Sequence, residues 1–433
     1  MREMKDTGLE WIDRIPEDWS IRPLKSLFDF GKGLPITKDN LVEVGLPVIS
    51  YGQIHAKWNS GVTIHEGLKR YVPNEYLETG SQSLVHKGDF IFADTSEDRE
   101  GCGNCAYVDC DDTLFAGYHT IILKSLTTNN NRYLAYLFLT DAWRSQIRKR
   151  VTGVKLFSIS KKILGETSVI LPSASDEIVN YLDIKASQIS DLIANEQTQI
   201  EKLKAYKQSL ITEVVTKGLD PSVPMKDSGV EWIGEIPEHW GVLQIARAFQ
   251  ERNEPGSDEL PILTVSINTG ISSEQLDDSD IGKTVIRIED KSKYKRVHVG
   301  DIAYNTMRAW QGAIGSARVD GVVSPAYVVA KPKLDLDTRY TEYLLRSASA
   351  IEEIRKYSYG IMDFRLRCYW QYFRRIFICI PPRVEQEKIA DFLDKKLEQT
   401  DRLIELKQSK IDKLDAYKKS LIYEYVTGKK EVV

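Results

Sequence analysis

The sequence predicts an α+β protein that is an internal duplication, with two globular segments joined by two long helices. The phrase DTGLEWIDRIPEDW at 6–19 returns almost unchanged as DSGVEWIGEIPEHW at 227–240. A long helical segment that ends at Gly218 likewise returns as one that ends at Lys429. Between these repeats lie short β-type runs with a few helical patches. A repeat of this length exceeds any solenoid period, so it indicates a duplicated half-molecule.

Each half opens on the tryptophan-rich phrase, in the N-terminal segment 1–20 and again in the linker 218–241. The phrase places Trp11 and Trp19 at the same spacing as Trp232 and Trp240. Tryptophans can stack on nucleic-acid bases, but a fixed spacing within a repeated phrase favours packing against another part of the same chain. We therefore expect the phrase to join each globular segment to a helix.

The globular segments, 21–175 and 242–385, share a skeleton. A β-type run begins with Gly88-Asp89 in the first and with Gly300-Asp301 in the second. A helical patch follows, then a glycine with basic neighbours, and then a proline exit into the long helix. Between these landmarks the two segments differ strongly. Repeated helices that carry two different globular segments favour a scaffold that presents two different recognition surfaces. We call these globular segments the heads.

The long helices are predicted at 176–217 and 386–427. Their seam positions alternate in steps of three and four, which is typical of a heptad repeat. Each helix would be roughly 60 Å long at 1.5 Å per residue, and its apolar stripe needs a cover, for which the other copy is the simplest choice. The seam residues are Leu182, Ala186, Ile189, Ile193, Glu196, Ile200, Leu203, Lys207, Leu210 and Val214, and then Leu393, Leu397, Thr400, Ile404, Lys407, Ile411, Leu414, Lys418, Leu421 and Tyr425.

The seam residues leave the direction of the helix pair open. Lys207 and Lys418 hold the same register, so a parallel pair would set ammonium against ammonium, which favours an antiparallel pair. Glu196 and Lys407 also share a register and favour a parallel pair. The domain-sized connection favours the antiparallel arrangement, in which two direct repeats are related by a local two-fold axis.

Composition sets the broad class. The 433 residues are enough for two or three domains, with 42% hydrophobic and 28% charged residues. No apolar run of about 18 residues and no signal-peptide core is present, so we expect a soluble, cytoplasmic protein. The net charge of -4 gives no bulk support for nucleic-acid binding, although a local basic face is compatible with it. The odd count of five cysteines argues against a disulfide framework.

Enzyme motifs are scarce. The chain has no phosphate-binding Walker loop, no GxGxxG, no HExxH and no GxSxG, and Pro381-Pro382 lacks the context of an adenine-methyltransferase loop. One pattern, Asp280 followed by Glu289-Asp290-Lys291, resembles the carboxylates and lysine of a metal-dependent nuclease. A solvated strand end explains the same residues. A self-contained nuclease is therefore an alternative to a non-catalytic protein.

Cys102, Cys105 and Cys110 crowd into CGNCAYVDC, with His119 downstream. A Cys-x-x-Cys pair with two further ligands is a spacing that can close a tetrahedral zinc site. The second half has no counterpart, so free thiols in a glycine-rich loop are the other interpretation.

With these phrases, the chain resembles the specificity subunit of type I restriction-modification systems. The resemblance covers essentially the whole chain. It rests on the EWIGEIPEHW openings, the paired Gly-Asp strands, IPPRVEQEKIADFLD at 380–394 and KLDAYKKSLIYEYVTGK at 413–429. It implies a fold of two target recognition domains, at 21–175 and 242–385, joined by an antiparallel coiled coil of the two long helices.

The resemblance also implies a function. The chain would be a non-catalytic reader of double-stranded DNA, with one domain for each half of a bipartite target. Two methyltransferase subunits would dock on the helices and restriction subunits would join them, in a system of DNA methylation and antiviral defence. The chain would need no cofactor itself, because S-adenosylmethionine, ATP and Mg²⁺ would be used by the partners. A coiled-coil scaffold that never contacts bases is a further alternative.

The loops after the Gly-Asp strands hold residue types that suit DNA. Arginine, glutamine and asparagine can recognise guanine and adenine edges by paired hydrogen bonds, and lysine and arginine bind phosphates. The candidate base-reading residues are Arg99 and Asn104 in the first domain and Arg308 and Gln311 in the second, and the candidate phosphate contacts are Lys155, Lys161, Lys162, Arg365 and Arg367.

Overall fold

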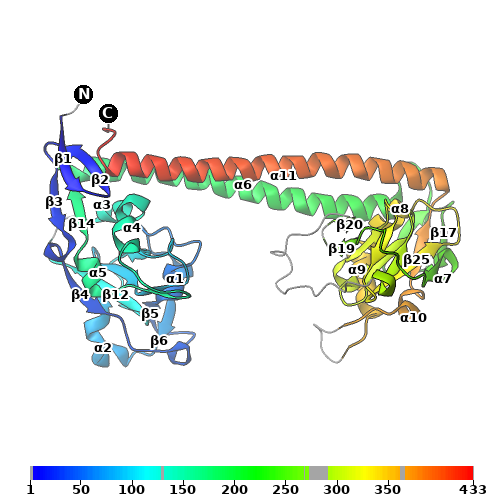
Figure 1. The fold of residues 1–433 in the computed structure, drawn as a ribbon, viewed down its shortest axis with the longest axis horizontal. Helices are drawn as coiled ribbons and strands as arrows, with labels where there is room; N and C mark the ends of the chain where they lie inside the picture. Colours follow the sequence, from blue (N-terminus) through cyan, green and yellow to red (C-terminus); the bar gives the residue numbers. More distant parts are fainter. Residues whose placement is uncertain (1–2, 128–130, 268, 273–290, 361–365, 433) are drawn as a thin grey trace. The chain divides into compact units, whose positions relative to one another are not determined.

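The computed structural model describes residues 3–127, 131–267, 269–272, 291–360 and 366–432, and the chain divides into two compact units. Unit 1 comprises Met1–Asn195 and Lys410–Val433, and unit 2 comprises Glu196–Ser409. Each unit therefore holds one globular head, the first part of one long helix and the last part of the other. Figure 1 shows both chain ends at unit 1.

The long helices are α6 (Ser175–Lys217) and α11 (Arg383–Val426). Acidic Asp176 and Glu177 occupy the first turn of α6, where the partial positive charge of the helix N-terminus favours them. Glycines with left-handed backbone follow both helices, Gly218 at φ +79° and Gly428 at φ +69°. Such glycines end helices at no steric cost. The sequence places the helices at 176–217 and 386–427, so the second one begins three residues earlier than expected.

Within each unit α6 and α11 lie side by side and run antiparallel (Figure 1). In unit 1 the Tyr181 ring lies 4.5 Å from the Tyr425 ring, and Lys418 Nζ donates to Ser190 Oγ at 2.8 Å. The facing residue number on α11 thus falls as the number on α6 rises. The predicted α+β fold with an antiparallel helix pair is confirmed.

In unit 2 the same direction explains a conflict in the sequence. Lys407 Nζ donates to Glu196 Oε2 at 3.0 Å, although this pair favoured a parallel arrangement in the sequence analysis. That argument is wrong, because the two positions also meet when the helices run antiparallel. Lys207 Nζ donates to Asp401 instead of facing another lysine. The lysine positions therefore predicted the direction correctly.

The head of unit 1 is built around a four-stranded antiparallel sheet in the order β10-β8-β12-β4. A second sheet, β6-β5-β11-β7, packs beside it and includes one parallel pair, β5 with β11. The elements are β1 (Met4–Leu9), β2 (Ile12–Pro16), β3 (Ser20–Pro23), η1 (Leu24–Ser26), β4 (Phe28–Lys32), η2 (Lys38–Asn40), β5 (Leu46–Ile49), α1 (Tyr51–Ile54), η3 (Glu66–Leu68), β6 (Arg70–Val72), α2 (Tyr76–Thr79), η4 (Ser81–Ser83), β7 (Leu84–Val85), β8 (Phe90–Ala93), β9 (Thr95–Ser96), β10 (Cys105–Tyr107), β11 (Leu114–Ala116), β12 (Thr120–Ser125), α3 (Arg132–Phe138), α4 (Asp141–Arg148), β13 (Phe157–Ser158), α5 (Lys161–Gly165) and β14 (Ser168–Leu171).

The head of unit 2 has the same central sheet, in the order β23-β22-β25-β18. Among its described residues, β19 pairs with β20 and β21 pairs with β24, where unit 1 has a second four-stranded sheet. The elements are β15 (Met225–Asp227), β16 (Glu235–Pro237), β17 (Gly241–Gln244), α7 (Ile245–Ala248), β18 (Phe249–Arg252), β19 (Thr264–Ser266), β20 (Gly270–Ser272), η6 (Lys291–Lys293), β21 (Lys295–Val297), β22 (Ile302–Asn305), η7 (Ala309–Gln311), β23 (Ile314–Ser316), β24 (Gly321–Val323), β25 (Tyr327–Pro332), α8 (Thr338–Leu345), α9 (Ala348–Lys356), α10 (Trp370–Phe373) and β26 (Phe377–Ile380).

The repeated Gly-Asp pair starts the central strand of each head. Buried Asp89 accepts hydrogen bonds from the backbone nitrogens of His86 and Ser125, at 2.9 and 2.8 Å. Buried Asp301 accepts the matching bond from His298 N at 2.9 Å. Each aspartate satisfies turn donors that would otherwise be buried without a partner. The motif therefore has a structural role at the start of β8 and β22.

Each head is joined to the helices by an Arg-Tyr-x-x-Tyr segment. In unit 1, Arg132 Nε and Tyr136 Oη donate to Asp183 of α6, at 2.9 and 2.5 Å. Tyr133 Oη, fully buried, donates to Val426 O at the end of α11, at 2.7 Å. The same head thus contacts both helices, and buried hydrogen bonds hold it in place.

Unit 2 repeats this joint with its own residues. Arg339 NH1 donates to Asp394 of α11 at 2.9 Å, and Tyr343 Oη donates to the same carboxylate. Tyr340 Oη donates to Val215 O near the end of α6 at 2.9 Å. The joint residues therefore correspond one for one between the two units.

The tryptophans of the opening phrase complete each joint. The Trp19 ring meets Tyr133 edge-on at 6.2 Å, and the Trp240 ring meets Tyr340 edge-on at 6.4 Å. A Cβ on Gly428 would lie 3.2 Å from Trp19, and one on Gly218 would lie 3.3 Å from Trp240. Each phrase thus covers the end of a long helix. The expectation that these tryptophans pack within the chain is confirmed.

No helix in the described part of the chain combines the length and apolar character that crossing a membrane requires.

Candidate nucleic-acid interface

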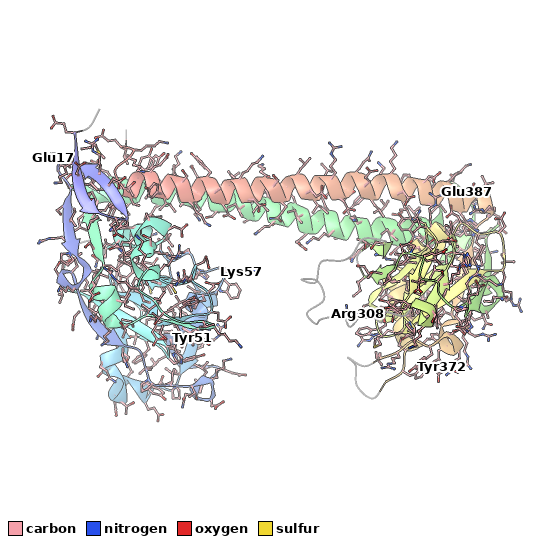
Figure 2. The ribbon with its side chains drawn as sticks, viewed as in Figure 1. Glu17, Tyr51, Lys57, Arg308, Tyr372 and Glu387 are labelled. Carbon is pink, nitrogen blue, oxygen red and sulfur yellow. The ribbon has the colours of Figure 1, made fainter. Side chains whose placement is uncertain are left out.

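Both heads are hollowed where the Gly-Asp strand ends. In unit 1 a cleft of about 590 Å³ lies beyond β8, and in unit 2 a cleft of about 580 Å³ lies beyond β22. The first cleft is lined by Tyr51, Gly52, His55, Ser96, Glu97, Asp98, Glu100, Gly101, Asn104 and Leu156. The second cleft is lined by Glu251, Lys295, Thr306, Met307, Pro325, Ala326, Tyr327, Val328, Arg367, Tyr369, Trp370 and Gln371. Figure 2 labels Tyr51 in the first head and Arg308, on the loop after β22, in the second.

A short hydrogen-bond chain orders one wall of the first cleft. His55 Nε2 lies 2.8 Å from Thr95 O, and Asn104 Nδ2 lies 3.1 Å from His55 Nδ1. Because a carbonyl only accepts, Nε2 carries the proton and Nδ1 accepts from the Asn104 amide. Asn104, a predicted base-reading residue, is therefore held in one orientation on the cleft wall.

Carboxylates dominate the first cleft. Glu97, Asp98 and Glu100 lie on the loop between β9 and β10, and all three are exposed. Asp98 Oδ1 accepts from Gly101 N at 2.6 Å, which tightens the loop. A Cβ on Gly101 would lie 2.5 Å from Ser96 Oγ, so any larger residue there would displace the Ser96 hydroxyl. Carboxylates repel phosphates but accept hydrogen bonds from the cytosine amino group, so this lining favours contacts with base edges.

Aromatic side chains lie beside the first cleft. The Tyr51 ring is 5.6 Å from Tyr118 and 5.4 Å from His119. His119 has a left-handed backbone at φ +54° and places Nδ1 3.2 Å from Asp94 Oδ1. Strained backbone of this kind is concentrated at functional sites. Sequence reasoning missed Tyr51 and His55, because they reach the cleft from a segment distant from the Gly-Asp strand.

The second cleft is lined by cations and aromatic rings. Arg367 NH1 donates to Tyr369 Oη at 3.4 Å, and Lys295 Nζ donates to Tyr327 O at 2.9 Å. Glu251 is the one carboxylate among its described lining residues. Sequence reasoning missed Gln371, and it notes Lys295 only within the basic run 291–296, which it interprets as a solvated face. A pair of β-strands brings Lys295 in from upstream of the Gly-Asp strand, and no local pattern indicates that placement.

The structure separates the predicted residues of the first head. Arg99 is exposed, with its guanidinium 5.7 Å from the centre of the Phe157 ring, and Lys155 is exposed next to Leu156 of the cleft wall. Lys161 and Lys162 lie on α5, and Lys161 Nζ donates to Phe30 O at 2.6 Å. Neither of these two lysines lines the first cleft.

In the second head Arg367 lines the cleft, whereas Arg308 and Gln311 are exposed around η7 without lining it. Arg365 lies outside the described residues. So do Asp280, Glu289 and Asp290 of the nuclease pattern, and nothing is described of the Lys291 side chain.

The cysteines do not assemble a metal site. Among the described residues no group of three or more histidine, cysteine or acidic side chains could hold a metal ion. Cys102 Sγ donates to Asp98 O at 3.5 Å, Cys105 is buried in β10, and His119 contacts Asp94. The zinc interpretation of Cys102, Cys105, Cys110 and His119 is therefore unsupported, because the glycine-rich loop turns the side chains to separate partners.

Buried thiols predict a loss of stability in alkali. Burial raises the pKa of Cys105 to about 12, and it raises the pKa of Cys379 to about 11. An unfolded thiol loses its proton near pH 8.5, so the unfolded state binds fewer protons than the folded state above that pH. Stability should fall between pH 8.5 and 11 by up to about 1.4 kcal/mol per pH unit for each thiol.

Urea unfolding at pH 7.5 and at pH 9.5 measures this effect. Cys105→Ala should show a smaller difference between the two pH values than the unaltered chain. An equal difference in both proteins would contradict the assignment. Added Zn²⁺ should leave the urea midpoint of either protein unchanged.

Comparison with known proteins agrees with the geometry. Residues 16–204 match the family model described as the type I restriction modification DNA specificity domain. Two relatives from Methanocaldococcus jannaschii are named as the MjaX and MjaVIII specificity subunits of type I restriction enzymes. They are 25% and 22% identical to this chain over 96% of its length, and the match covers 95% and 94% of theirs.

Two solved structures share the fold. One is a structure described as the structural basis of complex assembly and conformational transition of the type I R-M system. It has a TM-score of 0.66 and 15% identity, with 96% of this chain and 99% of that chain covered. The HsdS subunit from Thermoanaerobacter tengcongensis has a TM-score of 0.53 and 14% identity, with 98% and 99% covered.

In its repeated heads, its helix pair and these matches, the chain is similar over nearly its whole length to specificity subunits of type I restriction-modification systems.

Proposed function

We propose that this chain recognises a bipartite target in double-stranded DNA, with one half-site for each head. The observation that carries the proposal is the pair of clefts at equivalent places, each beyond the Gly-Asp strand of its head. Because the two clefts lie at equivalent positions of the repeated heads, they suit the same task, which is the recognition of DNA. Because different residues line the two clefts, they suit two different base sequences.

The charges of the clefts support two unlike half-sites. Glu97, Asp98 and Glu100 give the first cleft acceptors, which suit the cytosine amino group. Arg367 and Lys295 give the second cleft donors, which suit guanine and the phosphates beside it. We therefore expect the two halves of the target to differ in sequence.

The helices supply matching surfaces for two partner subunits. Leu192 and Leu403 hold equivalent positions in α6 and α11 and are both 48% exposed. Tyr206 and Tyr417, also equivalent, are 49% and 58% exposed. Exposed apolar side chains that recur at equivalent positions of the two helices suit the docking of one kind of partner twice. Two copies of a methyltransferase subunit, each using the same surface, would cover them, and restriction subunits would join through the methyltransferase.

The chain is proposed to be non-catalytic alone. Methylation of adenine requires the base to leave the stack and enter a pocket, which the methyltransferase subunit would provide. S-adenosylmethionine, ATP and Mg²⁺ would accordingly act in the partner subunits, which carry out methylation and cleavage.

Mapping N6-methyladenine by long-read sequencing tests the proposal. The chain is co-expressed with candidate methyltransferase subunits from its own genome. A motif with two short specific parts around a fixed gap is the expected result. A stable complex without any motif would favour a coiled-coil scaffold. Mg²⁺-dependent DNA cleavage by the chain alone, lost in Glu289→Ala, would favour the nuclease alternative.

Arg367→Ala should relax the sequence preference in one half-site. The guanidinium lines the second cleft, where arginine can bind guanine through two hydrogen bonds worth about 1–3 kcal/mol of discrimination. The methylation motif should become degenerate by one or two base pairs in one half and stay intact in the other. Arg374→Ala, an exposed arginine that does not line the cleft, is the matched control. Uniform weakening without degeneracy would reassign Arg367 to a phosphate contact.

A further inference from the structure

A third hollow lies within unit 1, between the first head and the C-terminal part of α11. It encloses about 970 Å³, more than either cleft. It is lined by Lys57, Trp58, Asn59, Ser60, Glu100, Asn104, Leu139, Thr140, Asp141, Ala142, Arg144, Arg148, Ser190, Asp415, Lys418, Lys419, Ser420, Ile422 and Tyr423. We call it the basic groove. Figure 2 labels Lys57 on the head side of this groove.

Positive charge exceeds negative charge in the basic groove. Its lining includes five cations, Lys57, Arg144, Arg148, Lys418 and Lys419, and three carboxylates, Glu100, Asp141 and Asp415. Arg148 NH1 already donates to Asp141 Oδ1 at 2.9 Å. The remaining cations leave the groove with unneutralised positive charge, in a chain whose net charge is -4.

The arginines of the groove have donors to spare. Arg144 Nε donates to Phe138 O at 2.7 Å, while among the described residues no acceptor is recorded for its two terminal nitrogens. Arg148 Nε is buried and has no hydrogen-bond partner in that same part of the chain. Burial and the neighbouring Arg148 lower the pKa of Arg144. Unsatisfied donors of this kind are costly unless a ligand supplies acceptors.

Lys418 differs in its surroundings from the equivalent lysine of unit 2. Its ammonium donates to the Ser190 hydroxyl at 2.8 Å, and no carboxylate in the described residues lies within ion-pair distance. The equivalent lysine, Lys207, is neutralised by Asp401. Burial lowers the pKa of Lys418, and Asp415 opposes this effect. The repeated sequence thus places a lysine with a direct ion pair in one unit and, among the described residues, a lysine without one in the other.

The basic groove continues the first cleft, because Glu100 and Asn104 line both. A DNA strand whose bases enter the first cleft would carry its next phosphates along the groove. The volume of the basic groove exceeds what a single phosphate needs and suits several linked nucleotides. Trp58, 60% exposed on the groove wall, adds a flat apolar face for a sugar or base.

We infer that the basic groove binds the phosphate backbone of DNA next to the half-site recognised in the first cleft, through Lys418, Arg144, Arg148 and Lys419. The inference rests on the proposed function of the first head. It adds a phosphate-binding site that includes a residue of the long helix, so that the helix pair contacts DNA on one side of the target only.

The salt dependence of DNA binding tests the groove. Lys418→Met is compared with Lys207→Met in the complex with methyltransferase subunits, on a duplex that carries the mapped target. Each lost phosphate contact should reduce the slope of log affinity against log salt by about 0.9. Between 50 and 200 mM salt, Lys418→Met should therefore lose about three- to four-fold less affinity than the unaltered chain. Lys207→Met should retain the full slope.

A second variant and a modified duplex separate binding from folding. Lys419→Gln changes an exposed side chain and should reduce the slope in the same direction. A duplex with uncharged methylphosphonate linkages beside the first half-site should abolish the difference between Lys418→Met and the unaltered chain. The same linkages beside the second half-site should not.

The outcomes are distinct from those of the proposed function. An unchanged slope of log affinity against log salt in both Lys418→Met and Lys419→Gln would contradict phosphate binding in the basic groove. This holds even when the methylation motif has the expected two parts. Loss of co-purifying methyltransferase subunit in Lys418→Met would show that the groove binds protein instead of DNA. Absence of any motif would contradict the reading function, while a changed slope on a random duplex would still support the groove.

Discussion

Lys407→Met should destabilise unit 2 by about 3–5 kcal/mol, the range for a buried ion pair that loses one partner. Glu196 is 5% exposed in the interface of α6 with α11, and Lys407 provides its counter-charge at 3.0 Å. Lys407 also donates to Gln199. Methionine keeps the aliphatic stem but removes the ammonium that contacts the Glu196 carboxylate. The loss is large because the charge cannot return to water without opening the helix pair.

A double-mutant cycle measures this coupling by urea unfolding. Glu196→Leu combined with Lys407→Leu should restore most of the stability, since an apolar pair can replace a buried ion pair at little or no cost. Lys204→Met, which breaks an exposed pair with Glu201 on the same helix, is the control and should cost less than about 0.5 kcal/mol. A cost for Lys407→Met as small as that of the control would contradict the prediction.

Trp240→Ala should destabilise unit 2 by a similar amount, about 3–5 kcal/mol. The side chain is 1% exposed, meets Tyr340 edge-on, and donates from Nε1 to Glu385 Oε2 at 3.0 Å. Its removal empties the contact between the opening phrase, the head and the end of α6. The cavity adds to the lost apolar burial, because the surrounding elements are held by their own hydrogen bonds.

Hydrogen exchange followed by mass spectrometry locates this effect. Trp240→Ala should lower the protection of peptides from the unit 2 head, and Trp19→Ala should do the same in the unit 1 head. Trp240→Phe fills most of the space and should cost much less. Unchanged protection around Tyr340 in Trp240→Ala would show that the phrase does not secure the joint. The pair of variants therefore tests why the phrase occurs twice.

Some features follow from local patterns in the sequence. The steps of three and four along the seam predict α6 and α11, because one covered stripe on a helix imposes that spacing. The matching phrases predict two equivalent joints, since the same residues in the same order make the same contacts. The Gly-Asp pair predicts the strand start in each head. Its role in satisfying turn donors is visible only in the hydrogen bonds of Asp89 and Asp301.

The candidate sites follow less directly. Asn104 and Arg367 line clefts as residue type and position suggest, whereas Lys161 is bound to Phe30 O and Arg308 lies outside the second cleft. Tyr51 and Lys295 reach the clefts from other segments. Strand pairing and loop paths set these placements, and neither has a short-range periodicity that a sequence displays.

The sequence by itself thus determined the duplication, the α+β class, the helix pair and the family resemblance, because each depends on repeated or periodic residues. Only the tertiary structure decided that Glu196 meets Lys407 in an antiparallel pair, and that Lys207 is neutralised while Lys418 faces a basic groove. The reason is physical. Two equivalent lysines in repeated helices acquire different surroundings when the residues opposite them, Asp401 and Ser190, come from different copies of the repeat.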